Sequence, residues 1–180
     1  MKKRLLCAGL AAAMAVSLTA CGGSAAGTKA EGSSASAEAN SEGGSEAAKV
    51  FKIGGIGPVT GGAAVYGMAV QHGTELAVNE INAAGGINGY QIEFQFQDDE
   101  HDAEKSVNAY NTLKDWGMQV LVGTTTSAPC LAVADKTAAD NMFQITPSGS
   151  VVECAANPNV FRICYSDPDQ GAASATYIGE

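Results

Sequence analysis

The chain has 180 residues, with 19 acidic against 10 basic side chains and a formal net charge of −9. Three of the basic residues, Lys2, Lys3 and Arg4, stand at the amino end, so the rest of the chain is more acidic still. Such a surface repels phosphate backbones, and we therefore expect no nucleic-acid partner. The uncharged run at the amino end, 5–20, is rich in Ala and Gly and shorter than the roughly 20 residues of a membrane span, so we expect no spanning helix there.

The amino end has the pattern of an export signal, with a short basic start, the uncharged run and small residues before Cys21. Leu18-Thr19-Ala20-Cys21 resembles the lipobox of bacterial lipoproteins, which is cut before its cysteine. The resemblance implies that 1–20 is a removed signal peptide and that Cys21 carries a lipid. We then expect an exported protein anchored to the outer face of the cytoplasmic membrane, at the cell surface or in the periplasm. A plain signal peptide followed by a chance cysteine is the alternative.

Residues 21–49 form the next segment, and from Gly22 onward they are almost all Gly, Ser, Ala or Glu. Such a composition cannot bury enough apolar surface to offset its ordering entropy, so we expect a flexible tether. Residues 50–180 remain to build a core, which fits one ordinary domain or one lobe of a larger protein.

Strands and helices alternate through the remainder of the chain. In chain order the pattern predicts a strand over 50–56, a helix over 67–84, a strand over 91–97, a helix from an Asp102 N-cap to Trp116, a strand over 120–122, a helix over about 129–141, strands over 143–145 and 160–163, and a helix from about 169. Alternation of this kind predicts an α/β fold, a parallel sheet with helices on both faces. The strict polar and apolar alternation of 91–97 places that strand near a sheet edge.

The helix that ends at Trp116 also has a predicted buried face. Its apolar residues at helical spacing are Ala103, Val107, Tyr110 and Leu113. Gly117 is the expected stop signal after them.

Two loops rich in hydroxyl groups follow predicted strands. Residues 123–129 carry four Ser or Thr side chains after the third strand, and 146–150 carries three after the fourth. Ligands of such sheets bind at the carboxyl ends of the strands. Hydroxyls and free N–H groups at a helix N-terminus can hold a carboxylate, and loop carbonyls can accept from an ammonium, so a zwitterion fits both. The alternative is that these side chains only cap helices and turns.

No arrangement of catalytic or metal-binding residues is present. Gly55-Ile56-Gly57 lacks the third glycine of a dinucleotide fingerprint, because Thr60 stands in its place. His72 and His101 lie on different predicted elements. The acidic run 98–102 lacks the ligand spacing of a calcium loop and is interpreted as a solvated turn. We therefore expect no enzyme, no cofactor and no bound metal.

Several short motifs follow one another over nearly all of 50–180. They are Ile53-Gly54-Gly55-Ile56-Gly57-Pro58-Val59-Thr60-Gly61, Tyr66-Gly67, the segment 73–89, Asp98-Asp99, Val122-Gly123, Thr146-Pro147-Ser148, Phe161-Arg162 and Asp169-Gln170-Gly171. Each is weak alone, but in this order they resemble the opening of the branched-chain amino acid binding proteins of ABC transporters, the leucine/isoleucine/valine-binding family of type I periplasmic binding proteins. The resemblance implies an N-terminal ligand-binding lobe over 50–165. It also implies a crossover over 166–180 into a second lobe that is cut short, so we expect an N-terminal fragment of a two-lobe protein.

The resemblance also assigns roles at the two hydroxyl loops. Ser127 would give its hydroxyl and N–H to the ligand's α-carboxylate, and Ser150 would help to bind both charged groups. The Ser148 carbonyl would accept from the α-ammonium, Gly149 belongs to the same loop, and Tyr66 would form part of the pocket wall. The implied function is capture of an amino acid, most simply Leu, Ile or Val, by closure of two lobes and its delivery to the permease subunits of an ABC importer. A sensory receptor domain of the same fold is the main alternative, and a surface α/β enzyme is a weaker one.

The cysteines depart from the family pattern. Some relatives have a disulfide between the second strand–helix turn and the serine loop, but those positions here are His101 and Thr126. Cys130, Cys154 and Cys164 are an odd set, of which at most two can pair, and the sequence does not choose among them.

Overall fold

The computed structural model describes residues 49–179. The predicted leader, Cys21 and the tether up to residue 48 lie outside this range. The strands are β1 Val50–Gly57, β2 Gln91–Asp98, β3 Val120–Val122, β4 Phe143–Thr146 and β5 Val160–Arg162. The helices are α1 Ala64–Ala83, α2 Ala103–Trp116, α3 Ser127–Ala139 and α4 Asp167–Gly179, with a 3₁₀ turn η1 at Val152–Ala155 that the sequence pattern did not predict.

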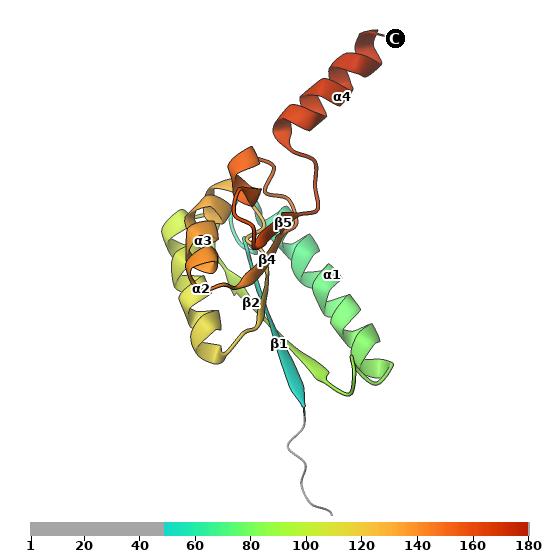
Figure 1. Cartoon of the computed structure of the whole chain (residues 1–180), viewed down its shortest axis with the longest axis vertical. Helices are drawn as coiled ribbons and strands as arrows, with labels where there is room; N and C mark the ends of the chain where they lie inside the picture. Colours follow the sequence, from blue (N-terminus) through green and yellow to red (C-terminus); the bar gives the residue numbers. More distant parts are fainter. Residues whose placement is uncertain (1–48, 180) are drawn as a thin grey trace, which may run out of the picture. The chain divides into compact units, whose positions relative to one another are not determined.

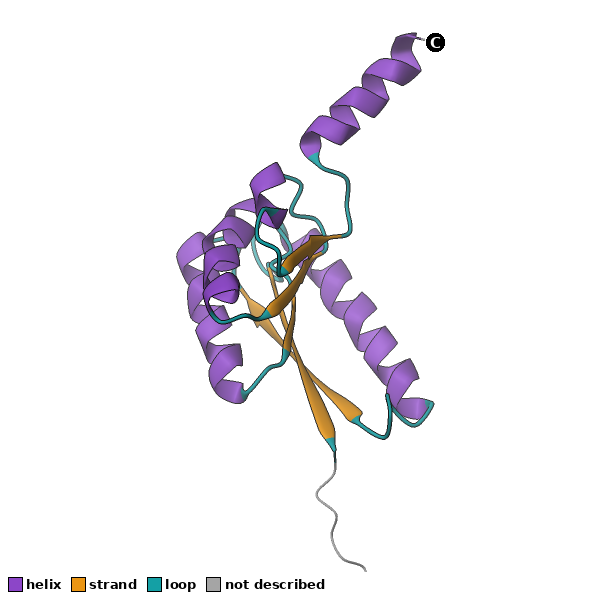
Figure 2. Ribbon diagram, viewed as in Figure 1, coloured by secondary structure: helices purple, strands orange, loops and turns teal. Residues whose placement is uncertain are grey.

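The five strands form one parallel sheet in the order β2-β1-β3-β4-β5. Helix α1 covers one face of this sheet, and α2 and α3 lie together on the other face (Figure 1, Figure 2). The predicted fold class is therefore confirmed. The expected edge position of β2 is also confirmed, since β2 pairs with β1 alone.

Helix boundaries follow local signals closely in α2. The Asp102 side chain accepts a hydrogen bond from the Lys105 N–H at 2.8 Å, and Gly117 ends the helix with a φ of 90°. Helices α3 and α4 start earlier than predicted, at Ser127 and Asp167. In both cases a proline lies inside the first turn, where its missing N–H costs no helical hydrogen bond.

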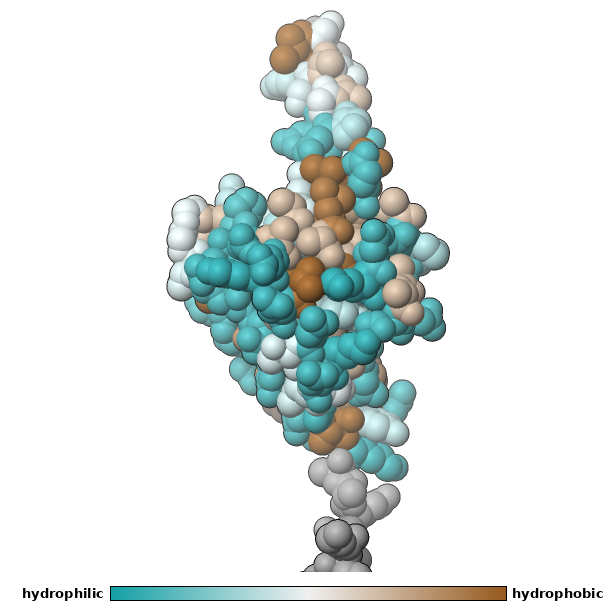
Figure 3. Space-filling view, turned by 90° about the vertical axis from the view of Figure 1, so that its left-hand side faces the viewer, coloured by the Kyte–Doolittle hydropathy of each residue, from teal (hydrophilic) through white to brown (hydrophobic). Residues whose placement is uncertain are grey.

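The core lies between the sheet and the pair α2 and α3. Its members are Ile56, Ala109, Tyr110, Leu113, Met118, Leu121 and Val133. Ala103 was wrongly assigned to the buried face of α2, because it lies exposed in the first turn while Ser106 is buried there against α3. The molecular surface on the side of α2 and α3 is mostly hydrophilic, with a few hydrophobic patches (Figure 3).

Helix α1 is held to the sheet at both ends. A Cβ at Gly67 would lie 1.8 Å from the Pro58 carbonyl oxygen, so only glycine allows this close approach to the loop after β1. Near the other end, the Asn82 side chain bonds both the N–H and the carbonyl of Ile92, each at 2.8 Å. None of the helices within 49–179 is both long and apolar enough to cross a membrane.

Candidate functional site

An open hollow of about 700 Å³ lies where the loops after β3 and β4 meet. It is lined by Tyr66, His101, Thr126, Ser127, Ala128, Ser148, Ser150 and Gln170. Parallel strands place their carboxyl ends along one edge, which is why segments distant in sequence converge here. The structure thus brings together four of the five sequence-predicted site residues.

Ser127 is the first residue of α3, and the backbone around it presents free donors. The Thr126 hydroxyl does not cap the helix, because it lies 2.8 Å from His101 Nδ1. Within 49–179 the N–H groups of Ser127 and Ala128 have no hydrogen-bond partner, and Pro129 has no N–H. Two free N–H groups at the positive end of a helix favour an anion in the hollow.

The loop after β4 orients the Ser127 hydroxyl. The Ser150 N–H donates to Ser127 Oγ at 3.1 Å, and this leaves the Ser127 O–H to act as a donor toward a ligand. The Ser148 hydroxyl donates to the Thr125 carbonyl at 2.6 Å, so the two loops are bonded directly to each other.

Gly149 is the predicted site residue that does not line the hollow. It is buried, and its N–H donates to Thr146 Oγ1 at 3.1 Å. A Cβ at this position would lie 2.6 Å from the same Thr146 oxygen. Gly149 therefore lets the loop pack closely behind Ser148 and Ser150.

Tyr66 reaches the hollow from the first turn of α1, and its side chain is 58 % exposed. The loop before α1 is held by Asp98, at the end of β2. Asp98 Oδ1 accepts from the Val59 N–H at 2.9 Å, and Oδ2 accepts from the Thr60 hydroxyl at 2.6 Å. Burial acts to raise the pKa of the Asp98 carboxyl, but these hydrogen bonds outweigh that effect and the pKa lies below its ordinary value.

Two lining residues were missed by sequence reasoning. His101 was set aside as a lone histidine, and Gln170 was noted only as part of a motif. His101 Nδ1 lies 2.8 Å from Thr126 Oγ1, and this contact joins the turn after β2 to the serine loop at the two positions where the family resemblance implied a disulfide. The implied disulfide, which would bring positions 101 and 126 together, was the only sequence signal that His101 lies near the serine loop.

Among residues 49–179, no Lys or Arg lines the hollow. Arg162, at the end of β5, instead donates to the Val151 carbonyl at 3.0 Å. A carboxylate bound here would therefore be recognised by backbone N–H groups and hydroxyls rather than by a cationic side chain.

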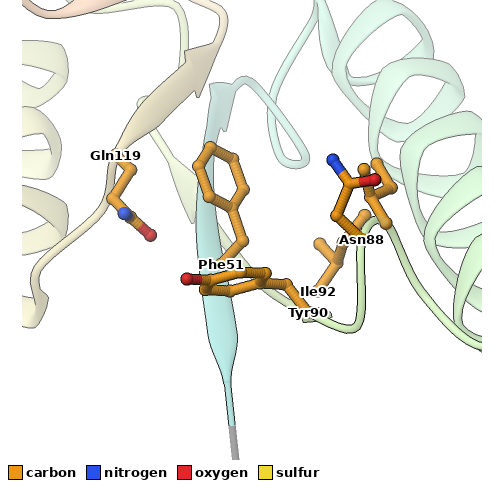
Figure 4. A pocket seen from close by; sticks show the side chains of 6 residues that line it. Phe51, Asn88, Tyr90, Ile92 and Gln119 are labelled. Carbon is orange, nitrogen blue, oxygen red and sulfur yellow. The ribbon is translucent and has the colours of Figure 1, made fainter.

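A second hollow, of about 410 Å³, lies at the amino ends of β1 and β2 (Figure 4). Phe51, Ile87, Tyr90 and Ile92 supply its apolar lining, and Asn88 and Gln119 stand at opposite sides. Its described lining residues include no helix N-terminus, whereas Ser127 and Ala128 at the start of α3 line the first hollow. The hollow at the carboxyl ends therefore fits a zwitterion better.

The chain is similar to proteins that are already known. Residues 50–180 match the family described as periplasmic binding protein. The chain is 34 % identical over 128 residues to Leu/Ile/Val-binding protein homolog 3 of Brucella melitensis, a match that covers 70 % of this chain and 35 % of that protein. It is 33 % identical over 138 residues to the leucine-, isoleucine-, valine-, threonine-, and alanine-binding protein of Pseudomonas aeruginosa, covering 76 % of this chain and 37 % of that one.

A solved structure is similar as well. The branched-chain amino acid transporter substrate binding protein of Streptococcus pneumoniae, in complex with isoleucine, is 31 % identical with a TM-score of 0.63. The similarity covers 66 % of this chain and 35 % of that one. The chain therefore spans about a third of the length of the relatives it matches.

Proposed function

Because the chain belongs to the periplasmic binding protein family, we propose that it forms the amino-terminal lobe of a protein that captures an aliphatic amino acid outside the cytoplasm. The family comprises solute-binding proteins and not enzymes, and it implies an extracytoplasmic location. The expectation of a non-enzymatic protein is thereby confirmed at the level of the family.

The observation that carries the proposal is the set of donors at the start of α3. The free N–H groups of Ser127 and Ala128 and the Ser127 O–H point to recognition of an α-carboxylate. The Ser148 carbonyl would accept from the α-ammonium, and Ser150 would assist both groups. Tyr66 would form part of the pocket wall.

The names of the relatives support the choice of ligand. The Brucella protein is named for Leu, Ile and Val, the Pseudomonas protein adds Thr and Ala, and the Streptococcus structure holds isoleucine. An aliphatic amino acid with free carboxylate and ammonium groups is common to all three.

Residues 50–165 would be the lobe itself, and 166–180 the crossover to a second lobe. A ligand held by both lobes would shift the open–closed equilibrium through its higher affinity for the closed form. The closed protein would then deliver the amino acid to the permease subunits of an ABC importer.

The binding proposal is tested by titrating the ¹⁵N-labelled chain with leucine and following backbone amide shifts by NMR. We expect the largest shifts at Ser127, Ala128 and the 148–150 loop. Ser127→Ala should weaken binding about 10-fold or more, because a hydrogen bond to a charged group is lost. Thr112→Ala, which removes an exposed hydroxyl from α2, is the matched control and should bind as the unaltered chain does.

Two analogues separate the recognition of the charged groups. Leucinamide lacks the carboxylate and should leave the Ser127 and Ala128 amides unshifted, whereas 4-methylpentanoate lacks only the ammonium and should still shift them weakly. Equal shifts with leucinamide and leucine would refute carboxylate recognition at α3. No shift with leucine, isoleucine or valine would refute the amino-acid site.

We also propose that 1–20 is removed, that Cys21 carries a lipid and that 21–49 tethers the lobe to the membrane. The lipobox resemblance supports this. Cys21→Ala should move the protein from the membrane fraction to the soluble fraction of cells, and continued membrane retention would contradict the anchor.

A further inference from the structure

Two buried thiols lie side by side behind the candidate site. Cys130 is in the first turn of α3, Cys154 is in η1, and both are fully buried. Cys130 Sγ lies 3.7 Å from the Cys154 carbonyl oxygen, and Cys154 Sγ lies 3.6 Å from the Ser127 carbonyl oxygen. A Cβ at Gly149 would lie 3.2 Å from Cys154 Sγ and 3.5 Å from Cys130 Cβ, so both cysteines flank the same glycine.

We propose that Cys130 and Cys154 form a disulfide that fastens the start of α3 to the segment after the 146–150 loop, with Cys164 left as a free thiol. This pairing does not depend on the ligand assigned above. Cys164 is only partly buried, in the loop between β5 and α4, and takes part in none of the contacts between the other two. An extracytoplasmic location supplies the oxidising environment in which disulfides persist.

The bond forms by two successive exchanges with a disulfide oxidant such as oxidised glutathione. One protein thiolate attacks a sulfur of the oxidant, which gives a mixed disulfide and releases one glutathione thiol. The second protein thiolate attacks the mixed disulfide and releases the other glutathione thiol. The protein loses two electrons and two protons, and one oxidised glutathione becomes two reduced molecules.

The folded environment protects both thiols. Burial raises the pKa of the Cys130 thiol, and burial together with the nearby Cys130 raises the pKa of the Cys154 thiol to about 12. Since the thiolate is the nucleophile in exchange, reaction in the folded chain should be slow. We therefore expect the disulfide to form while the chain folds, before the sulfurs are enclosed, and then to resist reduction by external thiols.

The disulfide is tested by mapping the full chain after it refolds in a mixture of reduced and oxidised glutathione. Free thiols are alkylated with iodoacetamide in denaturant, and the chain is digested with trypsin. Lys114, Lys136 and Arg162 place the three cysteines on separate peptides, 115–136, 137–162 and 163–180. We expect a cross-linked pair of the first two peptides, which reduction abolishes, and an alkylated third peptide.

The same peptide map also shows the outcomes that would contradict the proposed disulfide. Alkylation of both Cys130 and Cys154, or a link from either one to Cys164 or to the peptide with Cys7 and Cys21, overturns the proposal. Cys164→Ser should leave the cross-link intact, which makes it the matched control.

Thermal unfolding is an independent test of whether the disulfide stabilises the fold. Closing a loop from 130 to 154 constrains the unfolded chain, and the oxidised protein should melt on the order of 10 °C above the reduced protein. The double variant with Cys130→Ser and Cys154→Ser should melt at one temperature under both conditions. If the mapped cross-link forms only in unfolded or aggregated protein, with no rise in melting temperature, the proposed role in fastening the fold is wrong.

Discussion

Asp98 is the residue that couples the end of β2 to the loop before α1. It accepts hydrogen bonds from the Val59 N–H, the Thr60 hydroxyl and the Glu100 N–H. These bonds favour the ionised carboxylate, and the pKa of Asp98 in the folded chain is lowered. The stabilisation is therefore fully present above the ordinary pKa of an aspartate, about 3.9, and is lost as the pH falls through the lower, folded value.

We predict that Asp98→Asn lowers the free energy of unfolding by about 1 kcal/mol at pH 7, because the amide keeps one acceptor oxygen but loses the charge. The difference from the unaltered chain should shrink as the pH falls toward 3. Urea unfolding at both pH values measures it. Asp115→Asn changes an exposed carboxylate on α2 and should have little effect at either pH. A difference that is the same at pH 7 and pH 3 would contradict the role of the charge.

At the scale of elements, local signals predicted much and tertiary contacts supplied the rest. Strand and helix periodicity predicted all five strands and four helices, and the rule for parallel sheets predicted that the Ser127 and Ser150 loops converge. Local patterns carry no information about which polar residues a sheet will bury. Gln144 was interpreted only as the middle of a short strand, and His101 only as a lone histidine. Each side chain is held by a hydrogen-bond partner that lies more than five residues away in the sequence.

Gln144 joins three elements through one buried side chain. Its Oε1 accepts from the Thr137 hydroxyl of α3 at 2.7 Å, and its Nε2 donates to the carbonyl of Gly123, just beyond β3, at 2.9 Å. Gln144→Leu keeps the volume but removes the partner of the buried Gly123 carbonyl, whereas the Thr137 hydroxyl keeps its bond to the Ala134 carbonyl at 2.9 Å. We therefore predict a loss of about 1–3 kcal/mol in the free energy of unfolding. Gln95→Leu, on the exposed side of β2, is the matched control and should stay within about 0.5 kcal/mol.

Urea unfolding of the two glutamine variants measures whether this network, the hydrogen bonds of Gln144 to Thr137 and Gly123, stabilises the fold. A loss for Gln144→Leu no larger than that for Gln95→Leu would show that the network contributes nothing to stability. Because Gly123 begins the loop that leads to Ser127, a real loss should be accompanied by amide shifts through 123–128.

For the whole molecule, the decisive property is that the candidate site is open. Tyr66 is 58 % exposed, Ser127 and Ser150 are only partly buried, and every residue of α4 is exposed, including Gln170 at the edge of the hollow. Binding sites for small molecules usually enclose 70–90 % of the ligand surface, which is more than one open face can cover. A leucine in this hollow would keep its side chain largely in water.

We therefore predict that residues 1–180 alone bind leucine with a dissociation constant of about 1 mM or weaker, which corresponds to roughly 4 kcal/mol of binding free energy. The donors at α3 would supply most of that energy, and little would come from apolar burial. Valine, isoleucine and leucine should then bind within a few-fold of one another, because their side chains are hardly contacted. The amide titration measures all three constants. A dissociation constant in the micromolar range, or strong preference among the three, would show that this lobe by itself encloses the ligand and that closure by a second lobe is not required for affinity.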